Sequence, residues 1–577
     1  MKKLLSFLKP YVKESILGPL FKLLEATFEL FVPLVVAYLI DHGIGEGDSG
    51  AIWRAFLLLA LLGCIGLICS VTAQYFAAKA SVGCAGAVRH ALFAHVQTLS
   101  FSNLDTIGAS TLITRMTSDV NQVQSGLNLT LRLLLRSPFV VFGAMIMAFT
   151  IDFKSALVFA VTIPILSLVV FGIMLITMPL YKKVQGQLDG VLSSTRESLS
   201  GARVIRAFRM EEAAAAEFNT RNETLTATQK FVGKISALMN PITYVIINAA
   251  IILLLYTGAV QVDTGVLTQG QVVALYNYMS QILIELVKMA NMIIQLTKAA
   301  ACAKRIEDVL DTKPTQTWSD TAPETLPADS RVAFSHVSLR YAGAGADSLT
   351  DISFTARPGE TIGIIGGTGS GKSSLVQLIP RFYDATGGTV TVDGADVQSY
   401  PADMLRGRIG FVLQRATLFH GTIRDNLKWG QPDATDAELQ YAMEQAQAGE
   451  IFAAKGLDHM LEQDGRNLSG GQRQRLTIAR ALVRKPEILI LDDSASALDL
   501  ATDAALRKAI SEIDYHPTVF IVSQRTSSLR QADEILVLDD GVLVGKGDHD
   551  TLLATCDVYR EIHESQTGGA KKGGRTE

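Results

Sequence analysis

Long apolar runs alternate with polar stretches over roughly the first 300 residues, and the pattern changes after that point. Roughly 20 helical residues span about 30 Å, so an apolar run of that length can cross a bilayer. Six such runs lie at roughly 17–40, 54–78, 133–151, 155–179, 241–262 and 271–297. The polar stretches after the second and fourth runs are long and helical in pattern, whereas the other connections are short. The pattern therefore predicts an α-helical domain of six transmembrane helices, with two long loops and both chain ends on one side.

The distribution of charge gives this domain an orientation. Basic residues gather in the second long polar stretch: Lys182, Lys183, Arg196, Arg203, Arg206, Arg209, Arg221, Lys230 and Lys234. The short connections carry acidic residues instead, namely Asp41, Glu46, Asp48 and Asp263. Loops rich in lysine and arginine tend to stay in the cytoplasm. We therefore expect a multi-pass protein of the cell membrane, with the two long loops and both termini cytoplasmic.

Residues 1–15 combine lysines with leucines and aromatic residues. This mixture predicts a short amphipathic helix on the membrane surface. A signal peptide is the alternative, but no compact apolar region ending in a small-residue cleavage site follows.

Charged residues interrupt two of the apolar runs. Glu25 and Glu29 are four residues apart, and Glu285 and Lys288 are three apart, so each pair shares a helix face. A charge at bilayer depth is costly and normally faces a cavity or a partner. Either these residues line a transport pathway, or the helices extend beyond the bilayer and the charges lie in water.

Beyond the last apolar run, the composition is that of a soluble α/β domain. We expect a transmembrane domain at 1–312, a proline-containing linker at 313–330, an α/β domain at 331–566 and a disordered tail at 567–577. The mean hydropathy of +0.27 reflects the first domain. The net charge of -4 provides no basic field, so nucleic acid is not an expected partner.

A glycine-rich loop in the second domain carries the clearest chemistry. It follows a β-branched run at 361–365, precedes a helical pattern from Leu375, and consists of Gly366, Gly367, Thr368, Gly369, Ser370, Gly371, Lys372, Ser373 and Ser374. Such a P-loop turns backbone N–H groups toward a phosphate, and the helix that follows adds the positive end of its dipole. We expect it to bind ATP, with Lys372 on the β- and γ-phosphates and Ser373 on Mg²⁺.

Further motifs follow the P-loop along the chain. The apolar run at 488–492 ends in Asp492, as expected of a buried parallel strand that presents a metal ligand beside Ser373. Gln414 closes a strand-like run at 409–413. A second anion site, at the start of a helical pattern, is formed by Leu468, Ser469, Gly470, Gly471 and Gln472. Since one nucleotide already has its phosphates on the P-loop, the second site suggests a nucleotide clamped between two such domains.

Together these motifs resemble an ABC transporter half-unit of the exporter type, in which a transmembrane domain precedes an α/β P-loop NTPase domain of the ABC type. The resemblance covers essentially the whole chain. It implies a Walker A loop at 366–374, a Q-loop at Gln414, a signature motif at 468–472, a Walker B aspartate at Asp492 and a D-loop at 496–499 that ends in Asp499. The Mg²⁺ ligands would be Ser373, Asp492 and Gln414.

The resemblance also assigns an aromatic residue and two loops. Tyr341 matches the family's aromatic residue that stacks on adenine, and a core tyrosine is the alternative. Residues 108–119 and 199–218 resemble the two intracellular loops whose short coupling helices touch the nucleotide-binding domains.

Two positions depart from the family's pattern. The hydrolytic base of the family is a glutamate directly after the Walker B aspartate, but this chain has Asp493. The family's switch histidine is replaced by Gln524, after the strand at 518–523. Aspartate is shorter by one C–C bond, about 1.5 Å, and a misplacement of that size can cost about a hundredfold in rate. Glutamine forms hydrogen bonds but has no imidazolium form.

A chain with an intact signature motif but with Asp493 in place of the catalytic glutamate resembles one subunit of a heterodimeric multidrug-type exporter. Its partner would be a second ABC half-transporter, and Asp493, Gln524 and Gln414 would be the catalytic residues of its weak site. The alternatives are a homodimeric exporter with slow hydrolysis, and a regulatory protein that binds nucleotide without pumping. We expect a small-molecule or amphipathic substrate, such as a drug, a lipid or a peptide.

Overall fold

The computed structural model describes residues 2–323 and 329–567. The chain divides into two compact units: one contains Met1–Gln97 and Ala109–Thr312, and the other contains Thr98–Gly108 and Lys313–Glu577. The expected disordered tail at 567–577 lies outside the described residues, except that Thr567 ends helix α22 (Asp557–Thr567).

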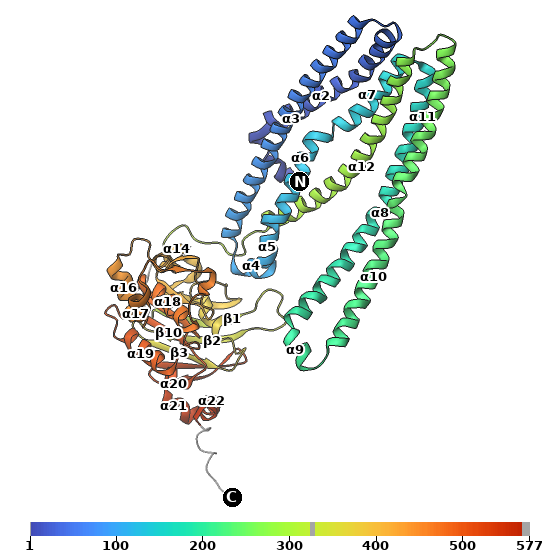
Figure 1. Cartoon of the computed structure of the whole chain (residues 1–577). Helices are drawn as coiled ribbons and strands as arrows, with labels where there is room; N and C mark the ends of the chain where they lie inside the picture. Colours follow the sequence, from blue (N-terminus) through green and yellow to red (C-terminus); the bar gives the residue numbers. More distant parts are fainter. Residues whose placement is uncertain (1, 324–328, 568–577) are drawn as a thin grey trace. The chain divides into compact units, whose positions relative to one another are not determined.

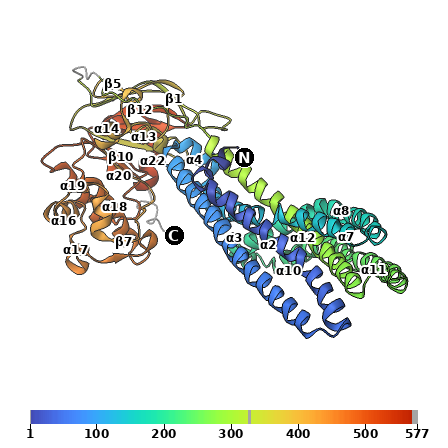
Figure 2. The ribbon, with the colours of Figure 1, turned by 90° about the horizontal axis from the view of Figure 1, so that it is seen from above.

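Every element of the first unit in the described part of the chain is helical (Figures 1 and 2). The elements are α1 (Lys2–Ser6), η1 (Lys9–Tyr11), α2 (Val12–Tyr38), η2 (Leu39–Gly45), α3 (Ser49–Thr98), α5 (Ala109–Thr114), η3 (Arg115–Asp119), α6 (Val120–Leu133), α7 (Arg136–Ile151), α8 (Phe153–Ser200), α9 (Ala202–Ala207), α10 (Glu211–Ala237), α11 (Met239–Asp263) and α12 (Gln269–Asp311). All of them except α1 and α9 belong to 6 segments of the described chain that are long and apolar enough to cross a membrane: Lys9–Gly45, Ser49–Thr98, Ala109–Ile151, Phe153–Ser200, Glu211–Asp263 and Gln269–Asp311. Each predicted run lies inside one of these segments, so the prediction of six helices is confirmed.

Several helices continue well beyond the length that a bilayer requires. Helix α3 has 50 residues and α8 has 48, which corresponds to more than about 70 Å at 1.5 Å per residue. The polar ends of α8 and α10 form the second long loop, and the short helix α9 closes it (Figure 1). The long polar stretches of the sequence are therefore extensions of the membrane helices.

Helix α12 holds the first unit together, because it contacts α2, α6, α7, α8 and α11. Its side chains Leu275, Tyr278 and Ile282 are fully buried in the main apolar cluster of the unit. The Tyr278 hydroxyl donates a hydrogen bond of 2.5 Å to the carbonyl oxygen of Leu30 in α2. The first and last membrane helices are thereby tied to each other.

The predicted amphipathic helix over residues 1–15 is wrong in its extent. Helix α1 ends at Ser6, and α2 begins at Val12 after the short turn η1. Pro10 lies in that turn, and a proline removes an N–H donor and restricts the backbone of its neighbours. Leu4 is buried against Cys84 and Val88 of α3. The segment therefore packs on a helix of its own unit.

The described residues of the second unit form three β-sheets. Its strands are β1 (Val332–Leu339), β2 (Leu349–Ala356), β3 (Thr361–Gly366), β4 (Gly387–Val392), β5 (Ala395–Asp396), β6 (Ile409–Val412), β7 (Gly421–Thr422), β8 (Met460–Leu461), β9 (Ile488–Asp492), β10 (Thr518–Val522), β11 (Glu534–Asp539) and β12 (Val542–Gly547). The 6-stranded sheet has the order β12-β11-β3-β10-β9-β6, the 4-stranded sheet has the order β2-β1-β4-β5, and β7 pairs with β8. In the 6-stranded sheet only the edge strand β12 is antiparallel to its neighbour.

Most helices of the second unit lie to one side of the strands β1, β5 and β12 (Figure 2). The helices of this unit are α4 (Phe101–Ile107), α13 (Lys372–Leu378), η4 (Val397–Ser399), α14 (Ala402–Gly407), α15 (Ile423–Lys428), α16 (Asp436–Gln445), α17 (Gly449–Lys455), η5 (Gln463–Gly465), α18 (Gly470–Val483), α19 (Leu500–Ser511), α20 (Thr526–Leu529), α21 (His549–Thr555) and α22. Strands that alternate with helices, as expected from the sequence, produce the mainly parallel sheet.

Helix α4 belongs to the second unit, although its neighbours in sequence belong to the first. The ring of Phe101 stacks on Phe382 with 4.6 Å between centroids. The Tyr383 hydroxyl donates a hydrogen bond of 2.5 Å to Oδ2 of Asp105. The structure therefore differs from the expected boundaries in one segment: residues 98–108 leave the membrane unit, whereas residues 109–119, in which we expected a coupling helix, stay in it.

Candidate nucleotide-binding site

Four strands of the 6-stranded sheet end at one edge, and residues of the predicted site follow each of them. Val522 of β10 pairs with Ile364 of β3 on one side and with Asp492 of β9 on the other. Val412 of β6 pairs with Leu491 of β9. The carboxyl ends of β3, β10, β9 and β6 are therefore level, and ligands of open parallel α/β sheets bind beyond such ends.

The loop after β3 passes so close to neighbouring backbone that only glycine fits at two positions. A Cβ atom at Gly366 would lie 2.1 Å from the carbonyl oxygen of Leu538. Gly371 has a φ of +92°, and a Cβ atom there would lie 2.6 Å from the carbonyl oxygen of Ser348. The glycines predicted from the motif thus form a tight loop in which no side chain covers the backbone N–H groups. Such a loop can bind a phosphate.

Lys372 and Ser373 open helix α13 beneath this cradle. The buried ammonium group of Lys372 donates to the carbonyl oxygens of Gly366 (2.9 Å) and Gly367 (2.5 Å). The Ser373 hydroxyl donates to Oδ1 of Asp492 at 2.8 Å. A hydroxyl and a carboxylate are hard oxygen ligands of the kind that Mg²⁺ prefers. The donors and acceptors of this site therefore fit ATP with Mg²⁺.

The residues from the four strand ends meet in one pocket of about 240 Å³. It is lined by Ser348, Thr368, Gly369, Gly371, Lys372, Ser373, Ser374, Gln414, Asp493, Val522 and Gln524. Gln414 donates from Nε2 to Oδ2 of Asp493 at 3.3 Å. Asp493 has a left-handed backbone, with a φ of +45°. The structure thus brings the P-loop, Gln414, Asp493 and Gln524 together in one pocket.

Burial shifts the protonation of the three charged groups at this site. It raises the pKa of Asp492 and of Asp493, and it lowers the pKa of Lys372. The hydrogen bond from Gln414 opposes the shift at Asp493, and the one from Ser373 opposes it at Asp492. Asp493 therefore takes up a proton at a higher pH than an exposed aspartate does, which is a property of a general base.

Sequence reasoning missed one residue that holds the loop after β10. Gln566 of α22 donates from Nε2 to the carbonyl oxygen of Gln524 at 2.6 Å. Its Oε1 accepts from the N–H of Thr526 at 2.9 Å. Nothing in the sequence signals this contact, because the two segments are about 40 residues apart and an exposed glutamine near a chain end has no distinctive pattern.

The signature residues lie elsewhere in the same unit, and none of residues 468–472 lines this pocket. Ser469 caps α18: its hydroxyl accepts from the N–H of Gln472, and the Gln472 side chain accepts from the N–H of Ser469. Asp499 caps α19 by accepting from the N–H of Thr502 at 2.9 Å. Helix α18 therefore begins at Gly470, directly after the capping serine and inside the signature motif, whereas the sequence indicates a start after the motif, at Arg473.

Tyr341 lies beside the P-loop without lining the pocket. Its hydroxyl donates to Oγ of Ser374 at 2.9 Å. Its ring packs edge-on against Tyr383, with 4.9 Å between centroids. This environment combines the packing of a core tyrosine with a position next to the predicted nucleotide.

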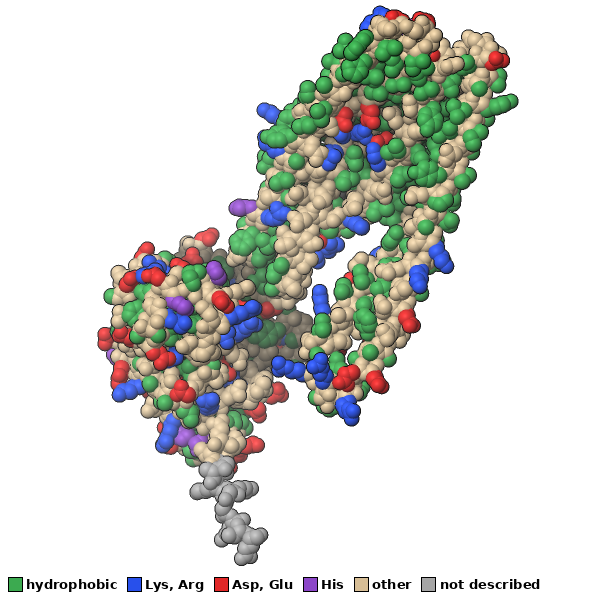
Figure 3. All heavy atoms as spheres, in the orientation of Figure 1, with side chains coloured by type: hydrophobic (Ala, Val, Ile, Leu, Met, Phe, Trp, Pro, Cys, Tyr) green, Lys and Arg blue, Asp and Glu red, His purple; other side chains and the backbone are tan. Residues whose placement is uncertain are grey.

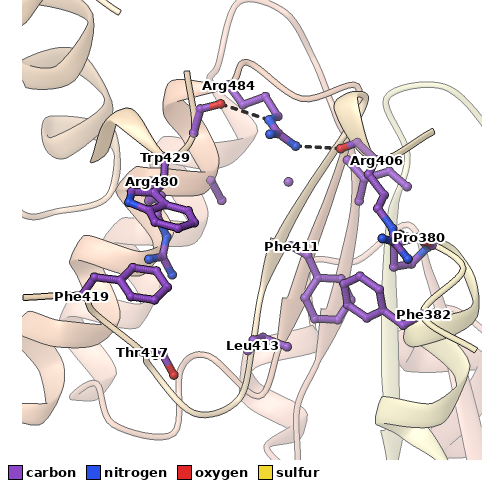
Figure 4. Close-up of a pocket in the computed structure, with 14 residues that line it drawn as sticks. Pro380, Phe382, Arg406, Phe411, Leu413, Thr417, Phe419, Trp429, Arg480 and Arg484 are labelled. Atoms are coloured by element: carbon purple, nitrogen blue, oxygen red, sulfur yellow. Dashed lines mark hydrogen bonds between the residues drawn. The ribbon is translucent and has the colours of Figure 1, made fainter. Parts of the chain in front are cut away.

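A second hollow, of about 440 Å³, lies beside the Q-loop (Figure 4). Phe382 and Phe411 lie on one side of it, and Phe419 and Trp429 lie on the other. The last two rings are stacked, with 4.4 Å between centroids. Leu413, the residue before Gln414, also lines the hollow. An apolar segment that entered it would contact the strand end that carries Gln414.

Comparisons with known proteins agree with this geometry. Residues 15–286 match the family described as ABC transporter transmembrane region, and residues 349–496 match the family described as ABC transporter. An uncharacterized ABC transporter ATP-binding protein of Mycobacterium tuberculosis (strain ATCC 25618 / H37Rv) is 37% identical over 98% of both chains. The probable multidrug resistance ABC transporter ATP-binding/permease protein YheI of Bacillus subtilis (strain 168) is 33% identical, over 98% of this chain and 97% of that one.

A solved structure, of a bacterial Atm1-family ABC exporter with ATP bound, has the same fold. It matches with a TM-score of 0.78 and 21% identity, covering 98% of this chain and 100% of that chain. The chain therefore belongs to the ABC transporter family, as an exporter half-transporter in which a six-helix membrane domain is fused to a nucleotide-binding domain that couples ATP hydrolysis to transport.

Proposed function

We propose that this chain is one subunit of a heterodimeric ABC exporter and that its own Walker site hydrolyses ATP slowly. The observation that carries the proposal is the pair Asp493 and Gln524, which lines the pocket in place of a glutamate and a histidine. The Asp493 carboxylate accepts a hydrogen bond of 3.3 Å from Nε2 of Gln414. A base placed about 1.5 Å short of its target loses on the order of a hundredfold in rate.

The intact half of the site binds the nucleotide. The P-loop N–H groups and Lys372 would hold the phosphates, and Ser373, Asp492 and Gln414 would hold Mg²⁺. When bound, ATP with Mg²⁺ would supply the phosphoryl group and the neutralising charge on which hydrolysis depends. Gln524 could donate a hydrogen bond to a phosphate, but it cannot hold the extra proton of an imidazolium ion.

The signature motif of this chain serves the partner's site. Ser469 and the first N–H groups of α18 form an anion site that this chain's own pocket does not use. A Cβ atom built on Gly470 meets nothing within 4 Å, so the space in front of the motif is open. Such a surface suits the phosphates of a nucleotide bound to a second subunit.

The two long loops couple hydrolysis to the membrane helices. Helix α4 contacts Phe382 and Tyr383 of the nucleotide-binding domain in the same chain. At α9 the apolar side chains of Val204 and Phe208 are 60% and 74% exposed. In the dimer, α9 of each subunit enters the apolar hollow beside the partner's Q-loop.

A small amphipathic substrate and a cytoplasmic nucleotide-binding domain complete the proposal. The similarity to a probable multidrug resistance transporter supports the substrate class. The basic residues of the second long loop support an orientation with both termini in the cytoplasm.

Steady-state ATPase measurements test the heterodimer. The purified chain alone is expected to bind Mg-ATP but to hydrolyse it more slowly than the pair isolated through a tag on this chain, by about a hundredfold. Lys372→Ala in the isolated chain gives the background rate, because it removes the phosphate-binding ammonium group. Equal specific rates for the chain and the pair would contradict the proposal and favour a homodimer.

A further inference from the structure

Charged side chains gather in the otherwise apolar part of the membrane unit (Figure 3). They are Lys22, Glu25 and Glu29 of α2, Arg136 of α7, and Glu285 and Lys288 of α12. The sequence indicated the two pairs at 25/29 and 285/288 separately. Arg136 joins them, since its side chain, only 8% exposed, contacts a carboxylate from each pair.

Glu285 is fully partnered in this network. Its Oε1 accepts from Nη1 of Arg136 at 2.7 Å and from Nζ of Lys288 at 2.9 Å. Its Oε2 accepts from the hydroxyl of Ser137 at 2.8 Å. With a side chain that is 4% exposed, Glu285 is a structural anchor between α12 and α7.

Glu25 is also satisfied within the network. Both of its oxygens accept from Nζ of Lys22, at 2.8 and 2.6 Å. The same ammonium group donates to the hydroxyl of Ser70 in α3 at 3.3 Å. This pair therefore has little remaining capacity to bind another charged group.

Glu29 differs from the other two acids. Its side chain is 41% exposed, and its one ion-pair partner among the described residues is Arg136, at 2.6 Å from Oε2. Arg136 keeps its bond to Glu285 if Glu29 turns toward another cation. Glu29 is therefore the carboxylate that can accept a new partner without leaving a buried charge unpaired.

Glu29 also lines a cavity of about 490 Å³ between α2 and α3, a volume typical of small-molecule sites. Most of its wall is apolar, formed by Phe28, Val32, Leu59, Leu62 and Leu67. Glu29 shares Arg136 with Glu285, so a cation bound in this mostly apolar wall would supply Glu29 with a positive partner of its own. The apolar side chains would meanwhile contact a hydrocarbon or aromatic body.

We propose that this cavity binds an amphipathic cation, with its positive group on the Glu29 carboxylate and its apolar body against Phe28 and the leucines of α3. An amphipathic anion fits less well, because the one cation that lines the cavity, Arg136, already holds two carboxylates. The identification of this ligand as the transported substrate rests on the proposed export function. Binding of the ligand to the cavity requires no nucleotide, so it can be measured separately.

Equilibrium binding to the full chain in lipid nanodiscs, without nucleotide, tests the site. The probes are tetraphenylphosphonium and tetraphenylborate, which share shape and size but have opposite charge. The wild type is expected to bind the phosphonium more tightly than the borate, and Glu29→Gln should weaken phosphonium binding by about tenfold or more. Glu14→Gln is the matched control, because Glu14 lies on the same helix and pairs with Lys79 at 2.9 Å outside the cavity.

A second variant separates charge from folding. Leu62→Trp fills the cavity without changing any charge and should weaken phosphonium binding as well. The proposal is overturned if Glu29→Gln binds the phosphonium as the wild type does, if the borate binds equally well, or if the wild type binds neither ion. ATPase of the pair is measured separately, so failure of this site and failure of the heterodimer proposal give different results.

Discussion

Asp493 and Gln524 follow two neighbouring strands, and in the proposed heterodimer their side chains limit the rate of this chain's own site. The double change Asp493→Glu with Gln524→His should raise ATP turnover at this chain's own site by about tenfold or more. The glutamate restores the length of the catalytic base, and the histidine restores an imidazole that can carry a proton. The measurement is steady-state ATPase of the pair with the partner's base neutralised. Asp493→Asn, which removes the carboxylate, should lower turnover instead. No rise in the double variant would place the deficit outside these two residues.

The contacts of single residues show which parts of the site could be predicted. Lys372 and Ser373 are recognisable from sequence because they follow a strand pattern, and Asp492 because it ends one. Parallel strands bring their carboxyl ends to one edge. Their hydrogen bonds match that expectation. Ser348 and Gln566 escape prediction, because each reaches the site from a segment that has no strand or helix pattern pointing to phosphate chemistry.

At the scale of elements, α4 offers a direct test of coupling. Phe101→Ala removes a stacked ring pair of a kind that contributes about 0.5–1.5 kcal/mol. Phe382 does not line the phosphate pocket, so ATP hydrolysis by the pair should persist while transport falls severalfold. Thr106→Ala is the control, since its hydroxyl bonds to Ser102 inside the same helix. An equal loss of both activities would show that Phe101 stabilises the domain and does not couple it.

Apolar runs in the sequence predicted the six membrane helices and the four strands that end at the site, and short-range chemistry explains some of the elements that were not predicted. The strand at Ile488–Asp492 has the predicted bounds, because a fully buried strand is a continuous apolar run. Helix α4 was missed because seven residues are too few for a distinct helical pattern, although Phe101, Leu104 and Ile107 recur every three positions and a capping box of Ser100 and Asn103 marks the start. The charged network in the membrane unit depends on Arg136, whose distance in sequence from Glu29 and Glu285 hides the contact.

At the scale of the whole molecule, the P-loop pocket and the signature surface of one chain belong to different active sites of the proposed dimer. Lys372 serves this chain's slow site, whereas Gly470 serves the partner's competent site. Two substitutions in one polypeptide should therefore have unequal effects. In a homodimer both substitutions would affect both sites, and both would abolish activity.

We expect Gly470→Glu to nearly abolish ATP hydrolysis and transport by the pair, and Lys372→Ala to leave a clear residual rate. The glutamate would place negative charge against the partner's terminal phosphate, where loss of a preorganised donor alone costs about 3–4 kcal/mol. Folding should tolerate it, because a Cβ atom at Gly470 meets nothing within 4 Å. Gly470→Ala is the control for the backbone, since it adds a methyl group without charge. The measurement is steady-state ATPase at ATP concentrations well above the binding constant. Under these conditions weaker ATP binding at the slow site does not lower the measured rate. If the Lys372→Ala pair is then as inactive as the Gly470→Glu pair, the site that contains Asp493 and Gln524 is not a weak site, and the heterodimer proposal is contradicted.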